Sequence, residues 1–272
     1  MTLNPADFTY VTTMVRQRSA IDLQPGKEYL VESRLAPIAR SMGEADVAAL
    51  VGRLRQGDPN VAEAVVDALT TNETSWFRDS FPFQAFTQHL LPEMAAAGRG
   101  PTIWSAACSS GQEAYSLAML LLDWLLAKPG LTAQIIGTDI SPRMVERARA
   151  GRYSQLEVNR GLPATYLIKH FDQEGRDWVL KAPVRAMARF ERANLALPPI
   201  GMPVCDIVFL RNVLIYFDMD TKRTVLGHVR QVLRPGGFLV LGGAESTLSL
   251  DSAFQRMELG KAVVFKFTGG GA

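Results

Sequence analysis

Two acidic residues stand where a parallel α/β sheet commonly binds a ligand. Asp139 follows the apolar run 133–137, and Glu113 lies in the first turn of the helix expected after the run 102–107. Ligands of such sheets lie beyond the carboxyl ends of the strands, where a carboxylate accepts hydrogen bonds from ribose hydroxyls. We favour this role for Asp139 over helix capping shared with Ser141. For Glu113, ligand binding and compensation of the helix dipole fit the pattern equally well.

The loop between the first expected strand and this helix, residues 105–111, consists of small residues and contains one glycine, Gly111. Such a loop lets a ligand approach the backbone and exposes N–H groups at the start of the helix. The three-glycine fingerprint of dinucleotide-binding sheets is absent, which argues against a nicotinamide-dependent oxidoreductase. A cofactor with a free amino acid end in place of a diphosphate fits this loop better.

Asn212 and Tyr216 follow another expected strand, 205–210, whose last four residues are apolar. An asparagine at a buried strand end is costly unless its amide is paired. The ring of Tyr216 is a candidate wall for the pocket in which the reacting group is exposed. The sequence shows no Ser/His/Asp set and no paired acid–base carboxylates.

The cysteines and histidines do not predict a metal site. Cys108 and Cys205 lie in or beside apolar runs, which indicates buried free thiols, and two cysteines are too few for a disulfide framework. None of the three histidines stands at ligand spacing from a cysteine or another histidine. We therefore expect no bound metal.

The composition is that of an ordinary globular chain. Its 272 residues suffice for a large α/β domain and a smaller companion, and a net charge of +2 does not favour nucleic acid as a partner. The N-terminus lacks a signal-peptide pattern, and the longest apolar stretch, 117–127, contains Asp123 and is too short to span a bilayer. These features predict a cytoplasmic protein without membrane insertion, and we expect a monomer.

The hydrophobic pattern changes along the chain. In residues 1–70 the apolar residues recur only at three- and four-residue spacing, which predicts an all-α domain, and a linker, 71–92, follows, which starts with a polar stretch. From 93 to 272, apolar runs alternate with helices, which predicts a doubly wound, Rossmann-like parallel sheet covered on both faces. The expected strands are 102–107, 133–137, 205–210 and 238–241, and the expected helices are 112–127, 141–151 and 218–233.

Two segments depart from this alternation. Residues 152–192 contain a short helical piece at 166–170 and strand candidates at 178–180 and 188–190, which we interpret as a small antiparallel β insertion. The last apolar run, 262–265, has no helix close before it and is predicted to be an added edge strand.

Four linked motifs occur in order through nearly the whole chain. They are NETSWFR at 72–78, WSAACSSGQEAYS at 104–116, GTD at 137–139 and RNVLIYF at 211–217. Together with the helical N-terminal part, they resemble the CheR family of chemotaxis receptor methyltransferases. Ala114 stands where that family often has proline and Gln112 where it often has glutamate, but neither change removes a group assigned to binding.

This resemblance implies S-adenosylmethionine as cofactor, S-adenosylhomocysteine as product and a contribution of the linker to the site. It implies that Glu113 and Asp139 hold the amino acid and ribose parts. The further cofactor-binding residues that it implies are Asn72, Thr74, Arg78, Asn194, Leu195, Asn212 and Val213.

The resemblance also implies the reaction. The methyl group passes to glutamate side chains on the cytoplasmic methylation helices of chemotaxis receptors, and the resulting methyl esters serve sensory adaptation. A glutamate is ionised near neutral pH, so this transfer needs no general base. We expect Tyr216 and the region of Arg78 to shape the acceptor side.

Similar proteins meet the receptor through a basic face of an N-terminal helix. Lys27, Arg34 and Arg40 are the candidates here, although Glu28 and Glu32 lie among them. A mixed solvated face with i,i+4 ion pairs explains these residues equally well. In some similar proteins the β insertion also binds a peptide tethered to the receptor's C-terminus. We expect that this protein does not need such a peptide.

Two other functions would share the cofactor motifs. A methyltransferase for another protein or a small molecule would have the same pocket without depending on the N-terminal helices. A non-catalytic S-adenosylmethionine-binding adaptor would keep the pocket and lose the transfer. Both alternatives stay open at the level of the sequence.

Overall fold

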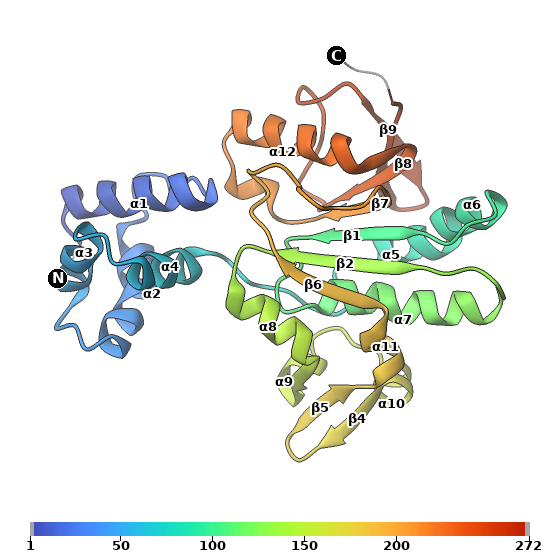
Figure 1. Ribbon diagram of the computed structural model, residues 1–272, viewed down its shortest axis with the longest axis horizontal. Coiled ribbons are helices and arrows are strands. Elements are labelled where there is room, and N and C mark those ends of the chain that lie inside the picture. Colours follow the sequence, from blue (N-terminus) through green and yellow to red (C-terminus); the bar gives the residue numbers. More distant parts are fainter. Residues whose placement is uncertain (1–2, 270–272) are drawn as a thin grey trace. The chain divides into compact units, whose positions relative to one another are not determined.

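The computed structural model describes residues 3–269 (Figure 1). Contacts divide the chain into two compact units. The first unit runs to Thr71 and includes residues 216–221, and the second comprises residues 72–215 and continues from Lys222. Each unit buries its own set of apolar side chains.

The first unit has the all-α fold that the spacing of its apolar residues predicts. Asp46 and Asp58 cap two of its helices, because their side chains accept the backbone N–H groups of Ala49 (2.8 Å) and Asn60 (2.9 Å). Leu35 is among the side chains that are fully buried between the helices. The helices between residues 3 and 71 are α1 (Pro5–Ser19), α2 (Glu28–Ser41), α3 (Val47–Arg55) and α4 (Pro59–Leu69).

From residue 72 onward, helices and strands alternate. The helices are α5 (Phe81–Ala85), η1 (Phe86–Leu90), α6 (Leu91–Ala96), α7 (Gln112–Leu126), α8 (Pro142–Ala150), α9 (Gln155–Val158), α10 (Ala164–His170), α11 (Ala182–Ala186), η2 (Leu214–Tyr216) and α12 (Met219–Val232). The strands are β1 (Thr102–Ala106), β2 (Gln134–Asp139), β3 (Arg152–Ser154), β4 (Phe171–Glu174), β5 (Asp177–Leu180), β6 (Ala188–Arg192), β7 (Cys205–Leu210), β8 (Leu233–Leu241), β9 (Phe254–Leu259) and β10 (Ala262–Phe267). Within residues 3–269, no helix is long and apolar enough to cross a membrane.

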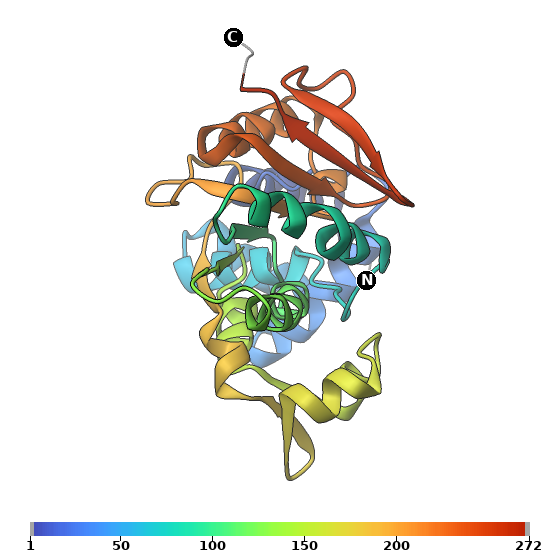
Figure 2. The ribbon, with the colours of Figure 1, turned by 90° about the vertical axis from the view of Figure 1, so that its right-hand side faces the viewer.

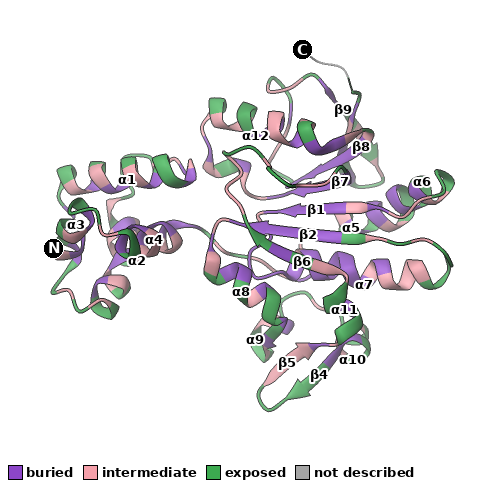
Figure 3. Ribbon diagram, in the orientation of Figure 1, coloured by how far each residue is buried: buried purple, intermediate pink, exposed green. Residues whose placement is uncertain are grey.

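The main sheet of the second unit has the strand order β6-β2-β1-β7-β8-β10-β9. The strands from β6 to β8 pair in parallel, whereas β10 is antiparallel to both of its neighbours. Val208 and Phe209 point to opposite faces of β7 and are both fully buried, so the sheet is covered on both sides (Figure 3). This arrangement, with the small antiparallel sheet β3-β5-β4, confirms the predicted Rossmann-like class.

Two strand assignments differ from the prediction. The run at 262–265 is not an edge strand, because β10 lies between β8 and β9, and β9 forms the edge. The candidate at 188–190 does not belong to the small sheet, because β6 pairs with β2 in the main sheet. Figures 1 and 2 show β4, β5 and α10 grouped apart from the main sheet, and α11 leads from this group into β6.

The strand order reverses between β1 and β7. These two strands are neighbours in parallel, with Ala106 opposite Leu210, so the loops that follow them start side by side. On the other side of β1, Ala106 lies opposite Thr138, which places the end of β2 at the same edge. Such a switch point is where doubly wound sheets bind their ligands.

Candidate cofactor-binding site

The loop after β1 folds back over the end of β2. Ala107, Ser109 and Gly111 have φ angles of 58°, 50° and 95°, a conformation that glycine adopts readily and other residues rarely. The N–H group of Cys108 donates to the carbonyl oxygen of Thr138 (2.9 Å). The backbone of this loop is therefore held at the carboxyl end of β2.

Asp139, the last residue of β2, fixes the same loop with its side chain. Its Oδ2 accepts the N–H of Ser109 (2.8 Å), and its Oδ1 accepts the N–H of Ser141 (2.9 Å). The side chain is buried, and Ser141 in turn caps α8 by accepting the N–H of Met144 (3.2 Å). Because each carboxylate oxygen has a second lone pair, this supporting role is compatible with the predicted binding of ribose hydroxyls.

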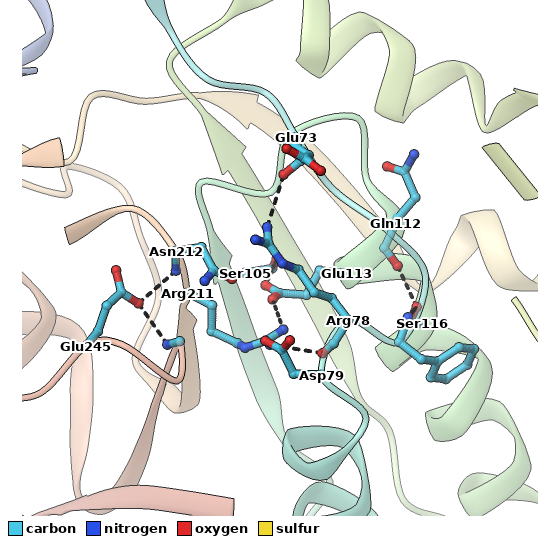
Figure 4. Close-up of polar contacts among 12 residues, drawn as sticks. Glu73, Arg78, Asp79, Ser105, Gln112, Glu113, Ser116, Arg211, Asn212 and Glu245 are labelled. Carbon is cyan, nitrogen blue, oxygen red and sulfur yellow. Dashed lines mark hydrogen bonds and ion pairs between the residues drawn. The ribbon is translucent and has the colours of Figure 1, made fainter. Parts of the chain in front are cut away.

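The sequence pattern gave no role to Arg211, yet its guanidinium joins several parts of the site (Figure 4). Nη1 donates to Oε2 of Glu113 (3.0 Å), and Nη2 donates to Oδ2 of Asp79 (2.7 Å) and the carbonyl oxygen of Arg78 (2.9 Å). Only 2% of the Arg211 side chain is exposed. The available signal was an arginine directly after the apolar residues 207–210, since a buried charge at that point requires a carboxylate partner.

Glu113, in the first turn of α7, is oriented from two sides. Its Oε1 accepts the hydroxyl of Ser105 (2.8 Å), and its Oε2 accepts Arg211. The carboxylate is 13% exposed. Its predicted role as ligand for the amino acid end of the cofactor therefore falls on a side chain with a fixed orientation.

The segment 72–80, which we call the linker strap, contains the predicted cofactor-binding residues Asn72, Thr74 and Arg78. Its start lies against the loop after β1, because the hydroxyl of Ser109 donates to the carbonyl oxygen of Asn72 (2.8 Å). Further along, Thr74 is half-buried, and Nη1 of Arg78 donates to the carbonyl oxygen of Glu73 (3.2 Å). The structure thus brings Asn72 to the loop after β1 and the Arg78 backbone to Arg211.

Trp76 anchors the linker strap to the small sheet. Its buried ring packs edge-to-face on Tyr153 (centroids 4.9 Å apart) and on Phe171 (5.4 Å). The hydroxyl of Tyr153 donates to the carbonyl oxygen of Ser110 in the loop after β1 (2.8 Å). The small sheet therefore contacts both the strap and the loop directly.

The residues predicted to complete the adenosine pocket follow β6 and β7. Asn194 accepts the N–H of Ala196 (3.0 Å) in a turn, and the carbonyl oxygen of Leu195 contacts Nδ1 of His228 (3.0 Å). Asn212 has a φ of 58° and precedes Val213. Because β6 and β7 are three strand spacings apart, the two pairs of residues lie roughly 14 Å apart along the sheet edge.

Four other predicted residues belong to the helical unit. Tyr216 is half-buried, and its carbonyl oxygen accepts the N–H of Asp22 (2.9 Å). Arg34 points to the end of α4, where its Nη1 donates to the carbonyl oxygen of Thr70 (3.0 Å). Lys27 and Arg40 are exposed. The roles predicted for these residues toward the receptor remain predictions.

Cys108 is not suited to be a nucleophile. Burial raises the pKa of its thiol well above the ordinary value, and the charges of Asp139 and Glu113 raise it further. The thiol is therefore protonated at neutral pH. Among the described residues, no three His, Cys, Asp or Glu side chains are grouped so as to hold a metal ion.

The charges at this sheet edge favour a particular ligand chemistry. Two carboxylates lie beside the loop after β1: Glu113 in the first turn of α7 and Asp139 at the end of β2, and Gly111 is the only glycine of that loop. Such a site would repel a diphosphate, and it complements a ligand that carries hydroxyls and positive charge. The residues present therefore fit the sugar, ammonium and sulfonium groups of S-adenosylmethionine.

Comparison with protein families supports the same conclusion. Two protein-family models match the chain. The family described as "CheR methyltransferase, SAM binding domain" matches residues 72–263, and the family described as "CheR methyltransferase, all-alpha domain" matches residues 6–70. The chain belongs to the CheR methyltransferase family. This finding confirms the predicted family and cofactor, and the boundary between the two matches coincides with the boundary between the two units.

Curated CheR-family relatives cover nearly the whole chain. "Chemotaxis protein methyltransferase 1" of Pseudomonas aeruginosa is 38% identical over 96% of this chain and 97% of its own length. "Chemotaxis protein methyltransferase" of Vibrio parahaemolyticus is 38% identical over 98% of each chain. The Escherichia coli protein of the same name is 30% identical over 93% of this chain and 89% of its own length.

Replacement of Asp139 by alanine tests the ribose assignment. We expect Asp139→Ala to weaken the binding of S-adenosylhomocysteine about ten- to a hundredfold in calorimetry, because charge-assisted hydrogen bonds are lost. Asp172→Ala, which removes an exposed carboxylate from β4, is the matched control and should leave binding unchanged. Unchanged affinity in a folded Asp139→Ala variant would contradict the assignment.

Proposed function

We propose that this chain is a protein-glutamate O-methyltransferase that methylates glutamate side chains of chemotaxis receptors for sensory adaptation. The observation that carries the proposal is the likeness to chemotaxis protein methyltransferases over nearly the whole chain, with the all-α domain included. A shared cofactor domain alone would leave the acceptor open. Since the methylation helices of such receptors are cytoplasmic, the proposal assigns the protein to the cytoplasm.

The chemistry of the site supports a carboxylate as acceptor. S-adenosylmethionine, when bound, would supply a methyl group on a sulfonium centre: a carboxylate oxygen would attack the methyl carbon in line as the carbon–sulfur bond breaks, with S-adenosylhomocysteine as the leaving group. The site then has to align the acceptor and exclude water, because a glutamate is already ionised near neutral pH. We assign Glu113 and Asp139 to the cofactor, and Arg78 and Tyr216 to the acceptor side, where a guanidinium can pair with a carboxylate.

The exposed face of α2 supports docking of an acidic helix. Tyr29, Ser33, Pro37 and Arg40 are exposed and recur at three- to four-residue spacing, so they form one stripe along the helix. Tyr29 is 82% exposed, which is unusual for an aromatic side chain.

Both acidic residues of this helix accept hydrogen bonds from backbone N–H groups. Glu28 accepts the N–H of Gly26 (3.2 Å), and Glu32 accepts the N–H of Leu3 (3.2 Å). Arg34 is engaged at the end of α4, so we assign docking to Lys27, at the start of α2, and Arg40. The aromatic ring and the two cations suit a partner helix rich in glutamate.

Transfer of label from S-adenosylmethionine to receptor cytoplasmic fragments tests the proposed reaction. We expect base-labile methyl esters on the fragment, and no label on a fragment whose acceptor glutamates are replaced by glutamine. Label on other proteins or small molecules, with the receptor unlabelled, would indicate a different acceptor. Binding of S-adenosylhomocysteine without any transfer would indicate an adaptor.

Charge reversal on α2 tests the docking surface. The double variant Lys27→Glu, Arg40→Glu should methylate the receptor fragment about tenfold more slowly at low salt, because it repels acidic helices. Its affinity for S-adenosylhomocysteine should not change. The double variant Arg189→Glu, Arg256→Glu, on the edge strands β6 and β9, changes the net charge by the same amount and is the control. Equal methylation rates for the original protein, the charge-reversal variant and the control would favour the interpretation of this helix face as a mixed solvated surface.

A further inference from the structure

The turn after β8 places one carboxylate against four backbone N–H groups. Oε1 of Glu245 accepts the N–H groups of Val213 (2.9 Å) and Leu214 (2.8 Å). Its Oε2 accepts those of Asn212 (2.7 Å) and Gly242 (2.8 Å), as Figure 4 shows in part. Two of the four donors, Asn212 and Val213, belong to the loop after β7, and a third, Leu214, begins η2. A half-buried carboxylate thus organises the backbone of this loop.

This contact follows from the sheet. β7 and β8 are parallel neighbours with Leu210 opposite Leu241, so the turn at 242–245 lies beside the loop after β7. The N–H of Glu245 donates to the carbonyl oxygen of Gly242 (2.9 Å), which closes the turn and brings the carboxylate back toward β7. Successive N–H groups that converge in this way form an anion-binding nest, and Glu245 occupies it.

The loop needs such a partner because of Asn212. Its φ of 58° is in the left-handed region, where a residue with a side chain persists only when its surroundings hold it. The N–H of Asn212 itself is one of the four donors to Glu245. The carboxylate therefore fixes the conformation that sets the direction of the Asn212 side chain.

Gly242 permits this close approach. A Cβ atom at this position would lie 2.7 Å from both Nδ2 of Asn212 and Oε2 of Glu245. The neighbouring Gly243 is exposed, and a Cβ atom there would meet nothing within 4 Å. The two adjacent glycines therefore provide a test and its control.

We propose that Glu245 is a positioning residue for the adenosine side of the cofactor site. It acts through the backbone of residues 212–214 and holds Asn212 and Val213 in their binding conformation. The inference rests on the proposed assignment of these two residues to the cofactor. Its failure is distinguishable from failure of that assignment, because Asn212→Ala tests the assignment directly.

The affinity for S-adenosylhomocysteine, measured by calorimetry well below the unfolding midpoint, tests the inference. We expect at least about tenfold weaker binding for Gly242→Ala, and a value within about twofold of the original for Gly243→Ala. Glu245→Gln adds no heavy atoms and provides a second variant if Gly242→Ala does not fold. It should show a similar loss, because an NH2 group replaces one acceptor oxygen in the nest.

Formate separates positioning from general stabilisation. In Glu245→Ala, sodium formate should restore much of the lost affinity, and sodium chloride at equal ionic strength should not, because a small carboxylate can occupy the nest. If Glu245 only stabilised the fold, formate would raise the unfolding temperature of Glu245→Ala without changing the affinity of the folded protein for S-adenosylhomocysteine.

Two results would overturn the inference. Unchanged affinity in folded Gly242→Ala and Glu245→Gln, with a loss in Asn212→Ala, would refute the role of Glu245 alone. Unchanged affinity in all three variants would refute the assignment of Asn212 to the cofactor as well.

Discussion

The buried guanidinium of Arg211 is the constraint on which the rest of the site depends. A charge inside a protein persists only where hydrogen bonds and opposite charge replace the water that it loses. Arg211 finds them in Glu113 on α7 and in Asp79 and the Arg78 carbonyl on the linker strap. Segments far apart in the sequence are thereby joined at the end of β7, and two of them carry residues that we assign to the cofactor.

The two loops at this edge of the sheet contain strained backbone that carboxylates hold in place. Ser109 and Asn212 adopt left-handed conformations, and carboxylates from neighbouring elements, Asp139 and Glu245, accept their N–H groups. Each such conformation costs roughly 1–2 kcal/mol, and charge-assisted hydrogen bonds of similar size offset it. A rigid frame suits the proposed reaction, because transfer to an ionised carboxylate depends on alignment more than on proton transfer.

The sequence predicted features that depend on neighbours along the chain. Apolar runs predicted the central strands. Ser141 before a proline predicted the start of α8, and the Ser141 side chain caps this helix by accepting the N–H of Met144. Strand order escaped prediction, because the spacing within β6 or β10 does not reveal which strand it pairs with. Ion pairs between residues distant in the sequence could not be predicted for the same reason: Arg211 contacts Glu113 and Asp79, which are 98 and 132 residues away along the chain. The contacts of Arg34 with the end of α4, which span 35 and 36 residues, are of the same long-range kind.

A double-mutant cycle on Arg211 and Glu113 tests most directly whether this buried pair organises the cofactor site. The affinity for S-adenosylhomocysteine would be measured for the original protein, Arg211→Lys, Glu113→Gln and the double variant. If the guanidinium acts by orienting the carboxylate, the two losses are not additive, and the coupling energy is at least about 1 kcal/mol. Losses that add to within about 0.5 kcal/mol would contradict the account, because the two side chains would then act independently.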